Sequence, residues 1–141
     1  MKKIKFEVLG TPVAKGRPRL GKFRTYTPQK TKNYEELIKL SFINKYSKFD
    51  PFMGELRVNI DAIFEVPKSY SQKKKVKLLN TGYTHRPDVD NLTKAVLDAL
   101  NGLAYKDDAQ VCSLNFDKYY GKEAKVIIEI EEVLSCERTD N

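Results

Sequence analysis

The chain has 141 residues and a formal net charge of +7, from 26 lysines and arginines against 19 aspartates and glutamates. This length favours a single domain, and 40% hydrophobic residues are enough to build one core. No apolar run reaches the length of a membrane span, no apolar signal segment follows the charged N-terminus, and the two cysteines form neither a disulfide framework nor a zinc motif. We therefore expect a cytoplasmic protein that does not associate with membranes.

The positive charge is concentrated in two segments. Residues 1–28 hold eight basic residues and one acid, and residues 67–87 hold six basic residues and no acid. Residues 129–141, by contrast, hold five acids and one arginine. Such asymmetry is typical of a protein that binds a polyanion on one face, although an ordinary basic surface explains it about equally well.

The N-terminal half predicts a strand, a basic loop, a helix and a second strand. Apolar and polar residues alternate over residues 4–8 and again over residues 56–66, which predicts half-buried strands. Between them, Thr27-Pro28 is typical of a helix start, and apolar residues then recur at helical spacing to about Tyr46.

The C-terminal half predicts two further helices and two strands. Residues 69–79 predict a short basic helix, and residues 90–101 a longer one. Strands at 112–116 and 126–133 should form a hairpin around a turn at 118–122. We expect one α/β (α+β) domain at 1–135, with a mixed sheet packed against helices, and a polar tail at 136–141.

Basic residues in the loops and on the short basic helix are the candidate nucleic-acid contacts. The loop at 11–26 is broken by glycines and prolines, and its cations are interleaved with Phe23 and Tyr26. Arginines can fork onto phosphate oxygens and aromatic rings can stack on bases, so we favour contact with a nucleic acid over a solvated loop here. For the lysines of the short basic helix the two interpretations are equally good. The candidates are Lys15, Arg17, Arg19, Arg24, Lys73, Lys74, Lys75 and Arg86.

Aspartates stand at both ends of the longer C-terminal helix. Asp88 and Asp90 precede or begin it, and Asp107 and Asp108 follow it. An apolar stripe runs between them, and Asn101-Gly102 supplies a stop signal. The residues of the stripe are Leu92, Val96, Ala99, Leu100 and Leu103.

These acids are candidate ligands for a metal ion. In an extended segment, side chains at i and i+2 can face one place, so Asp88 and Asp90 can converge. Two adjacent carboxylates repel each other unless a cation joins them, and Mg²⁺ prefers oxygen ligands. A third carboxylate from Asp107 or Asp108 would complete the site if that segment folds back. The alternative is that these aspartates only cap a helix and form a turn.

Lys94 lies one helical turn after Asp90 and one before Asp98. It can hold a scissile phosphate or offset charge in the transition state. It can equally form an ion pair with either aspartate, and Asp98 is better explained as its partner than as a metal ligand. His85 is the only histidine, which gives little support to a triad with a histidine base.

The segment from Arg86 to Val111 closely resembles the RusA-like Holliday-junction resolvase family. The resemblance rests on R-P-D-V-D-N-L-T-K-A-V-L-D-A-L-N-G followed by Y-K-D-D-A-Q-V, and on the upstream P-V-A-K-G-R-P-R and Y-T-P. It covers roughly residues 4–133. It implies a small homodimeric α/β endonuclease, dependent on Mg²⁺ with Mn²⁺ as a substitute, that cuts paired strands of four-way DNA junctions. Many members of the family come from prophages.

Carried over by motif, the resemblance implies that Asp88, Asp90, Lys94 and Asp108 are catalytic. Asp88, Asp90 and Asp108 would bind the metal, with Asp107 as the alternate third acid. Two other functions stay open. One is a non-catalytic nucleic-acid-binding protein whose aspartates serve as caps and turns, and the other is a metal nuclease that acts on other branched DNA.

Overall fold

The structure is a computed structural model, and it describes residues 2–15, 19–20, 25–26 and 29–133. The predicted helix start at Thr27-Pro28 and the predicted polar tail at 136–141 lie outside these residues. The elements are β1 (Lys3–Leu9), β2 (Arg19–Leu20), β3 (Thr25–Tyr26), α1 (Gln29–Lys45), β4 (Leu56–Glu65), α2 (Gln72–Leu78), α3 (Val89–Leu100), the 3₁₀ turn η1 (Asp108–Gln110), β5 (Val111–Gly121) and β6 (Lys125–Glu132).

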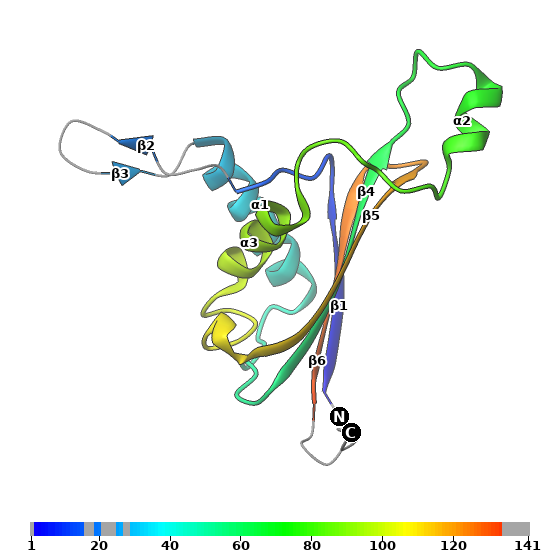
Figure 1. The fold of residues 1–141 in the computed structure, drawn as a ribbon. Helices are drawn as coiled ribbons and strands as arrows, with labels where there is room; N and C mark the ends of the chain where they lie inside the picture. The colour runs from blue at the N-terminus through cyan, green and yellow to red at the C-terminus, as the bar shows by residue number, and fades with distance from the viewer. Residues whose placement is uncertain (1, 16–18, 21–24, 27–28, 134–141) are drawn as a thin grey trace.

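A four-stranded sheet in the order β1-β6-β4-β5 forms the centre of the domain (Figure 1). β6 pairs antiparallel with β1 and β4, whereas β4 and β5 pair in parallel. Helices α1 and α3 lie together on one side of the sheet (Figure 1). The predicted single α+β domain with a mixed sheet is confirmed.

The predicted hairpin between the last two strands is wrong. β5 and β6 follow each other in sequence, but β4 lies between them and pairs with both. β5 also continues through the predicted turn, because its pairing with β4 extends to Gly121 opposite Glu65. The chain then crosses β4, a distance of two strand spacings or about 10 Å. Alternation within a segment indicates a strand but does not identify its partner.

Gly121 lies where β5 passes closely over Ile63 of β4. A Cβ atom at Gly121 would overlap Cγ2 of Ile63, whose side chain is buried. We expect Gly121→Ala to lower the free energy of unfolding by about 1–3 kcal/mol, as measured by urea denaturation. Gly82→Ala is the matched control, since a Cβ there meets nothing within 4 Å. An equal loss of stability in both variants would contradict this explanation.

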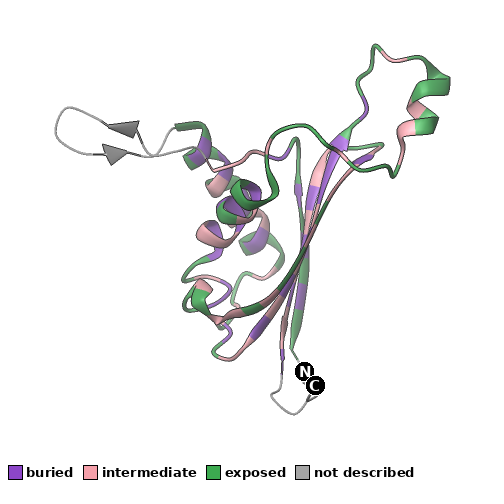
Figure 2. Cartoon of the chain, viewed as in Figure 1, coloured by how far each residue is buried: buried purple, intermediate pink, exposed green. Residues whose placement is uncertain are grey.

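The core lies between the sheet and the two helices, as Figure 2 shows by burial. The apolar face of α1 contributes Tyr34, Ile38 and Phe42, and the predicted stripe of α3 is buried except for the half-buried Leu103. Gly102, with φ of 82°, follows the end of α3 as predicted. Because this stripe fixes α3 on the sheet, the polar face of the helix points away from the core.

Helix α2 stands apart from the core (Figures 1 and 2). It has no buried residue, and Val76, part of its predicted apolar face, is 61% exposed. Ser71 caps it by accepting a hydrogen bond from the backbone amide of Lys74 at 3.2 Å. The lysines of α2 are therefore carried on an element that contributes little to the core.

The sheet face opposite the helices is polar and largely neutralised by its own ion pairs. Arg57 pairs with Glu131 at 2.9 Å, and Lys125 pairs with Glu7 at 3.1 Å. Asp61 lies on this face and accepts a hydrogen bond from the hydroxyl of Tyr119 at 3.0 Å. Among the described helices, none combines the length and the hydropathy that a bilayer crossing requires.

Candidate active site

Helix α3 begins at the predicted aspartate pair. Asp88 is its N-cap residue with an extended backbone, at φ −75° and ψ 153°, yet its side chain accepts no capping hydrogen bond. Asp90 lies in the first turn, and both side chains are exposed. The positive end of the helix dipole favours carboxylates here. Asp88 thus occupies a cap position while its carboxylate is not used as a cap.

One groove brings together three of the four predicted catalytic residues. Asp90, Lys94 and Asp98 follow one another at intervals of four residues, so they share one face of α3. Asp108 lies across the groove from a different part of the chain. The groove has a volume of about 580 Å³ and is lined by Val89, Asp90, Thr93, Lys94, Leu97, Asp98, Asp108 and Leu114. Asp88 is not part of this lining.

The segment after α3 folds back to bring Asp108 to the groove. The amide of Asp108 donates to Oδ1 of Asn101 at 2.9 Å, which ties it to the end of α3. Gln110 fastens the same turn to the domain, because its Nε2 donates to the carbonyls of Phe52 and Gly54 at 2.9 and 3.0 Å. Sequence reasoning missed this role of Gln110, whose carbonyl partners lie more than fifty residues away.

Asp107 and Asp108 differ in what their side chains do. The carboxylate of Asp107 accepts a hydrogen bond from the amide of Ala109 at 2.9 Å, and the amide of Asp107 donates to Oε1 of Gln110 at 2.9 Å. The Asp107 side chain also accepts from the backbone amide of Gln110, and this bond together with the one to Gln110 Oε1 forms a capping box at the start of η1. Asp107 therefore serves the local structure, whereas Asp108 lines the groove.

The end of the groove at Asp108 has an excess of negative charge. The pKa of the Asp108 carboxyl is raised above its usual value, first by partial burial and then by the neighbouring Asp107 and Asp98. Lys15 offsets part of this charge, since its ammonium lies 3.2 Å from Asp98 and 2.7 Å from Glu35. Burial lowers the pKa of Lys15, but its hydrogen bonds to these two carboxylates outweigh burial and the pKa is raised overall.

Lys15 and Lys94 are placed differently from what their spacing predicts. Asp98 pairs with Lys15, and Lys94 forms no ion pair within the described part of the chain. Lys15 also donates its backbone amide to the carbonyl of Asn91 at 3.0 Å. Lys15 therefore ties the start of the basic loop to α3, while the ammonium of Lys94 is exposed beside Asp90.

The residues of the groove suit a divalent cation in their chemistry. Across the described ranges, no three His, Cys, Asp or Glu side chains are grouped closely enough to hold an ion. Asp90 and Asp98 are eight residues apart, a rise of about 12 Å, so one ion cannot bridge them. Mg²⁺, however, typically needs one or two carboxylates plus substrate phosphate. After burial, the negative charges of Asp107 and Asp98 raise the pKa of the Asp108 carboxyl, and a bound cation would offset these charges.

The candidate DNA contacts lie on two sides of α3. Lys73 and Lys74 are exposed on α2, Lys75 is half-buried there, and Arg86 is exposed before α3. In Figure 1, α2 and the β2–β3 pair stand out from the domain in opposite directions. Arg19 lies in β2, whereas Arg17 and Arg24 fall outside the described residues.

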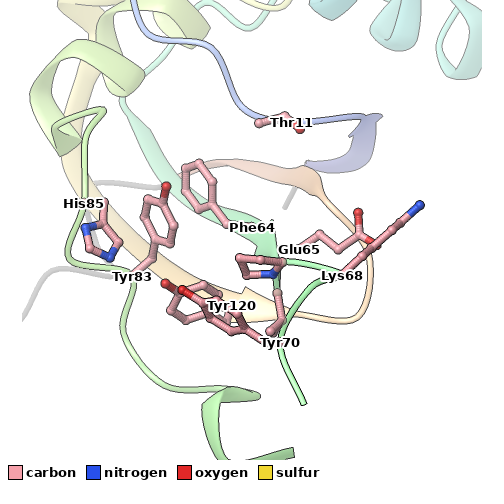
Figure 3. Close-up of a pocket in the computed structure, with 10 residues that line it drawn as sticks. Thr11, Phe64, Glu65, Lys68, Tyr70, Tyr83, His85 and Tyr120 are labelled. Carbon is pink, nitrogen blue, oxygen red and sulfur yellow. The ribbon is translucent and has the colours of Figure 1, made fainter. Parts of the chain in front are cut away.

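An aromatic pocket lies beside the segment that leads into Asp88 (Figure 3). Phe64 and Tyr83 stack with ring centroids 3.8 Å apart, and Tyr120 and His85 contact Tyr83 by their edges. The pocket has a volume of about 430 Å³. No local sequence pattern indicates this cluster, because its members come from β4, β5 and the loop before α3.

The structure is a small α+β domain in which one groove brings together acidic side chains and the lysine of α3. The chain belongs to the family described as Endodeoxyribonuclease RusA, which matches residues 10–131. It is also 39% identical over 140 residues to the uncharacterized protein YqaN of Bacillus subtilis (strain 168), covering 92% of this chain and 96% of that protein. The resemblance found in the sequence is thereby confirmed, and membership supports a nuclease.

Proposed function

We propose that the protein is a Mg²⁺-dependent endonuclease that resolves four-way (Holliday) DNA junctions by paired phosphodiester hydrolysis. Membership of the RusA family supports the nuclease activity. The observation that carries the proposal is the groove in which Asp90, Lys94 and Asp108 meet.

In this proposal the candidate ligands of Mg²⁺, or of Mn²⁺ as a substitute, are Asp88, Asp90 and Asp108. No three of the described acids are grouped closely enough to hold an ion by themselves, so one or two of these carboxylates would bind it together with a phosphate of the DNA. The cation supplies Lewis-acid polarisation of the scissile phosphate. Lys94 lies one turn from Asp90 and has no carboxylate partner among the described residues, so its ammonium can neutralise phosphate oxygens as charge develops. Lys15 limits the repulsion between DNA and the groove by offsetting Asp98.

The remaining cations hold the DNA in this proposal. Exposed lysines of α2 and Arg86 would contact phosphates on one side of α3, and the basic loop would contact them on the other. A homodimer would present two equal grooves, which suits paired incisions in a branched substrate. A cytoplasmic location fits this activity, and a prophage origin stays a prediction.

A cleavage assay on synthetic DNA tests the proposal. The purified protein is incubated with a labelled four-way junction and with a linear duplex, in Mg²⁺, in Mn²⁺ and in EDTA, alongside Asp88→Asn. We expect paired incisions of the junction that need a divalent cation and are lost in Asp88→Asn. Binding without cleavage in every metal would refute the enzyme, and equal cleavage of the linear duplex would refute the preference for junctions.

One observation favours the alternative, a nucleic-acid-binding protein without catalytic activity. Asp107 does serve as a cap, as that alternative predicts for the aspartates. The same assay decides, because a binding protein would retain junction affinity without cutting. Flap and fork substrates added to the assay would identify a metal nuclease with another branched substrate.

A further inference from the structure

The segment that carries the chain into Asp88 has little backbone support of its own. Before it, the amide of Tyr83 donates to the carbonyl of Lys118 in β5 at 3.1 Å. After it, the amide of Leu92 donates to the carbonyl of Asp88 at 3.1 Å as α3 begins. Between these two points, residues 84–87 form no backbone–backbone hydrogen bond with any described residue. The position of this segment must therefore be set by side chains.

Lys118 supplies most of that support. Its ammonium donates to the carbonyl of His85 at 2.8 Å and to the carbonyl of Pro87, the residue before Asp88, at 2.8 Å. The hydroxyl of Tyr83 adds a longer contact of 3.4 Å to the carbonyl of Arg86. The carbonyls of three successive residues are thus held by the side chains of Lys118 and Tyr83.

Both supporting side chains are themselves well fixed. Lys118 belongs to β5 and lies opposite Ala62 in the parallel pairing with β4. The Tyr83 ring is stacked on Phe64 and contacts Tyr120 by its edge, as Figure 3 shows. Lys118 also lies 5.6 Å from the centre of the Tyr83 ring. The segment is consequently held against the sheet and not against α2.

The bonding of Lys118 is unusual for a lysine on a protein surface. Within the described residues its ammonium pairs with no carboxylate, and two of its three donors are used on backbone carbonyls. Hydrogen bonds from a charged donor are shorter and stronger than neutral ones. A half-buried lysine that binds two carbonyls on either side of Arg86 fixes the path of the backbone into α3.

We propose that Lys118 is a positioning residue for cleavage, which acts by holding the 85–87 segment so that Asp88 is correctly placed beside the groove. This inference rests on the proposed function for its effect on activity. Lys118 does not line the groove, and its ammonium donates to the backbone carbonyls of His85 and Pro87, so its effect would pass through the backbone of that segment.

Lys118→Met tests the proposal because it keeps an unbranched side chain of similar length and removes the donors. We expect the single-turnover rate of junction cleavage at saturating enzyme to fall by about 100-fold, the effect of a misplacement of about 1 Å. The Kd for the junction should change by less than about threefold, because one cation among many contributes little to binding. Amide hydrogen exchange in a peptide covering residues 84–92 should become faster.

Two further variants complete the experiment. Lys118→Arg retains charge and donors and should recover most of the cleavage rate. Lys122→Met is the matched control, since Lys122 is an exposed lysine after the same strand, with no hydrogen bond or ion pair to any described residue, and it should cut at the normal rate.

The outcomes separate this inference from the proposed function. A normal cleavage rate in Lys118→Met, or unchanged exchange over residues 84–92, would overturn the positioning role. If Lys118→Met lowers the melting temperature, the affinity for the junction and the cleavage rate together, the positioning role is also overturned, and Lys118 has a general structural role. If the unsubstituted protein cuts no junction, the proposed function fails instead, and the exchange measurement still decides whether Lys118 holds the segment.

Discussion

Asp90→Asn should abolish junction cleavage while junction binding is retained or tightened. The substitution keeps the shape of the side chain and removes one negative charge from the groove beside Lys94. In the proposed function Asp90 is a ligand of the cation. Loss of a ligand charge that stabilises the transition state by several kcal/mol corresponds to a rate lowered by about 1,000-fold or more. Binding is spared because a carboxylate that faces phosphate opposes association. Single-turnover cleavage and a gel-shift titration of the junction measure the two effects separately.

Asp117→Asn is the control for this prediction. Asp117 is an exposed aspartate opposite Asp61 in the β4–β5 pairing, on the polar sheet face away from α3. It should cut junctions at the normal rate. If Asp90→Asn instead loses its fold and its binding together with cleavage, the carboxylate of Asp90 is structural. A normal cleavage rate would remove Asp90 from the site.

The fold could be predicted largely from local patterns. The alternation in β1 and β4 and the apolar stripe of α3 identify these elements, because burial of one face imposes a period on the sequence. What the patterns could not predict is which strands pair. β5 and β6 are neighbours in sequence and predict a hairpin, but β4 takes the position between them. Such a choice depends on the whole sheet and leaves no local signature.

The sequence predicts which types of residue line the candidate site, but it does not predict which distant residues those side chains contact. Spacing alone placed Asp90 and Lys94 on one face of a helix, and the groove includes both. Spacing also suggested Lys94 as the partner of Asp98, whereas the partner is Lys15, more than eighty residues earlier in the chain. Lys118 was missed for the same reason, because its role is defined by backbone carbonyls thirty or more residues away. Contacts between distant segments exist only once the fold brings them together.

The two aspartates of the second pair should respond differently to substitution. Asp108→Asn should lower the single-turnover cleavage rate by about 100-fold or more, because it removes a charge that lines the groove and that would face the cation in the proposed function. Its melting temperature should change little, since the bond from the Asp108 amide to Asn101 belongs to the backbone and is retained. Junction binding should be unchanged or tighter.

Asp107 should show the opposite pattern. Asp107→Asn should cut at close to the normal rate, because asparagine can also accept the hydrogen bond from the amide of Ala109. Asp107→Ala loses that cap and should lower the free energy of unfolding by about 0.5–2 kcal/mol. Thermal and urea denaturation measure this loss, and cleavage is measured at a temperature where each variant is folded.

These three variants together decide which acid belongs to the groove. The proposed assignment requires a large loss of rate in Asp108→Asn, a normal rate in Asp107→Asn and a loss confined to stability in Asp107→Ala. The reverse pattern would make Asp107 the third acid and would mean that the capping box opens when DNA and metal bind. Normal cleavage in both asparagine variants would show that the groove needs no carboxylate from this turn, so that the cation would be held at the start of α3 alone.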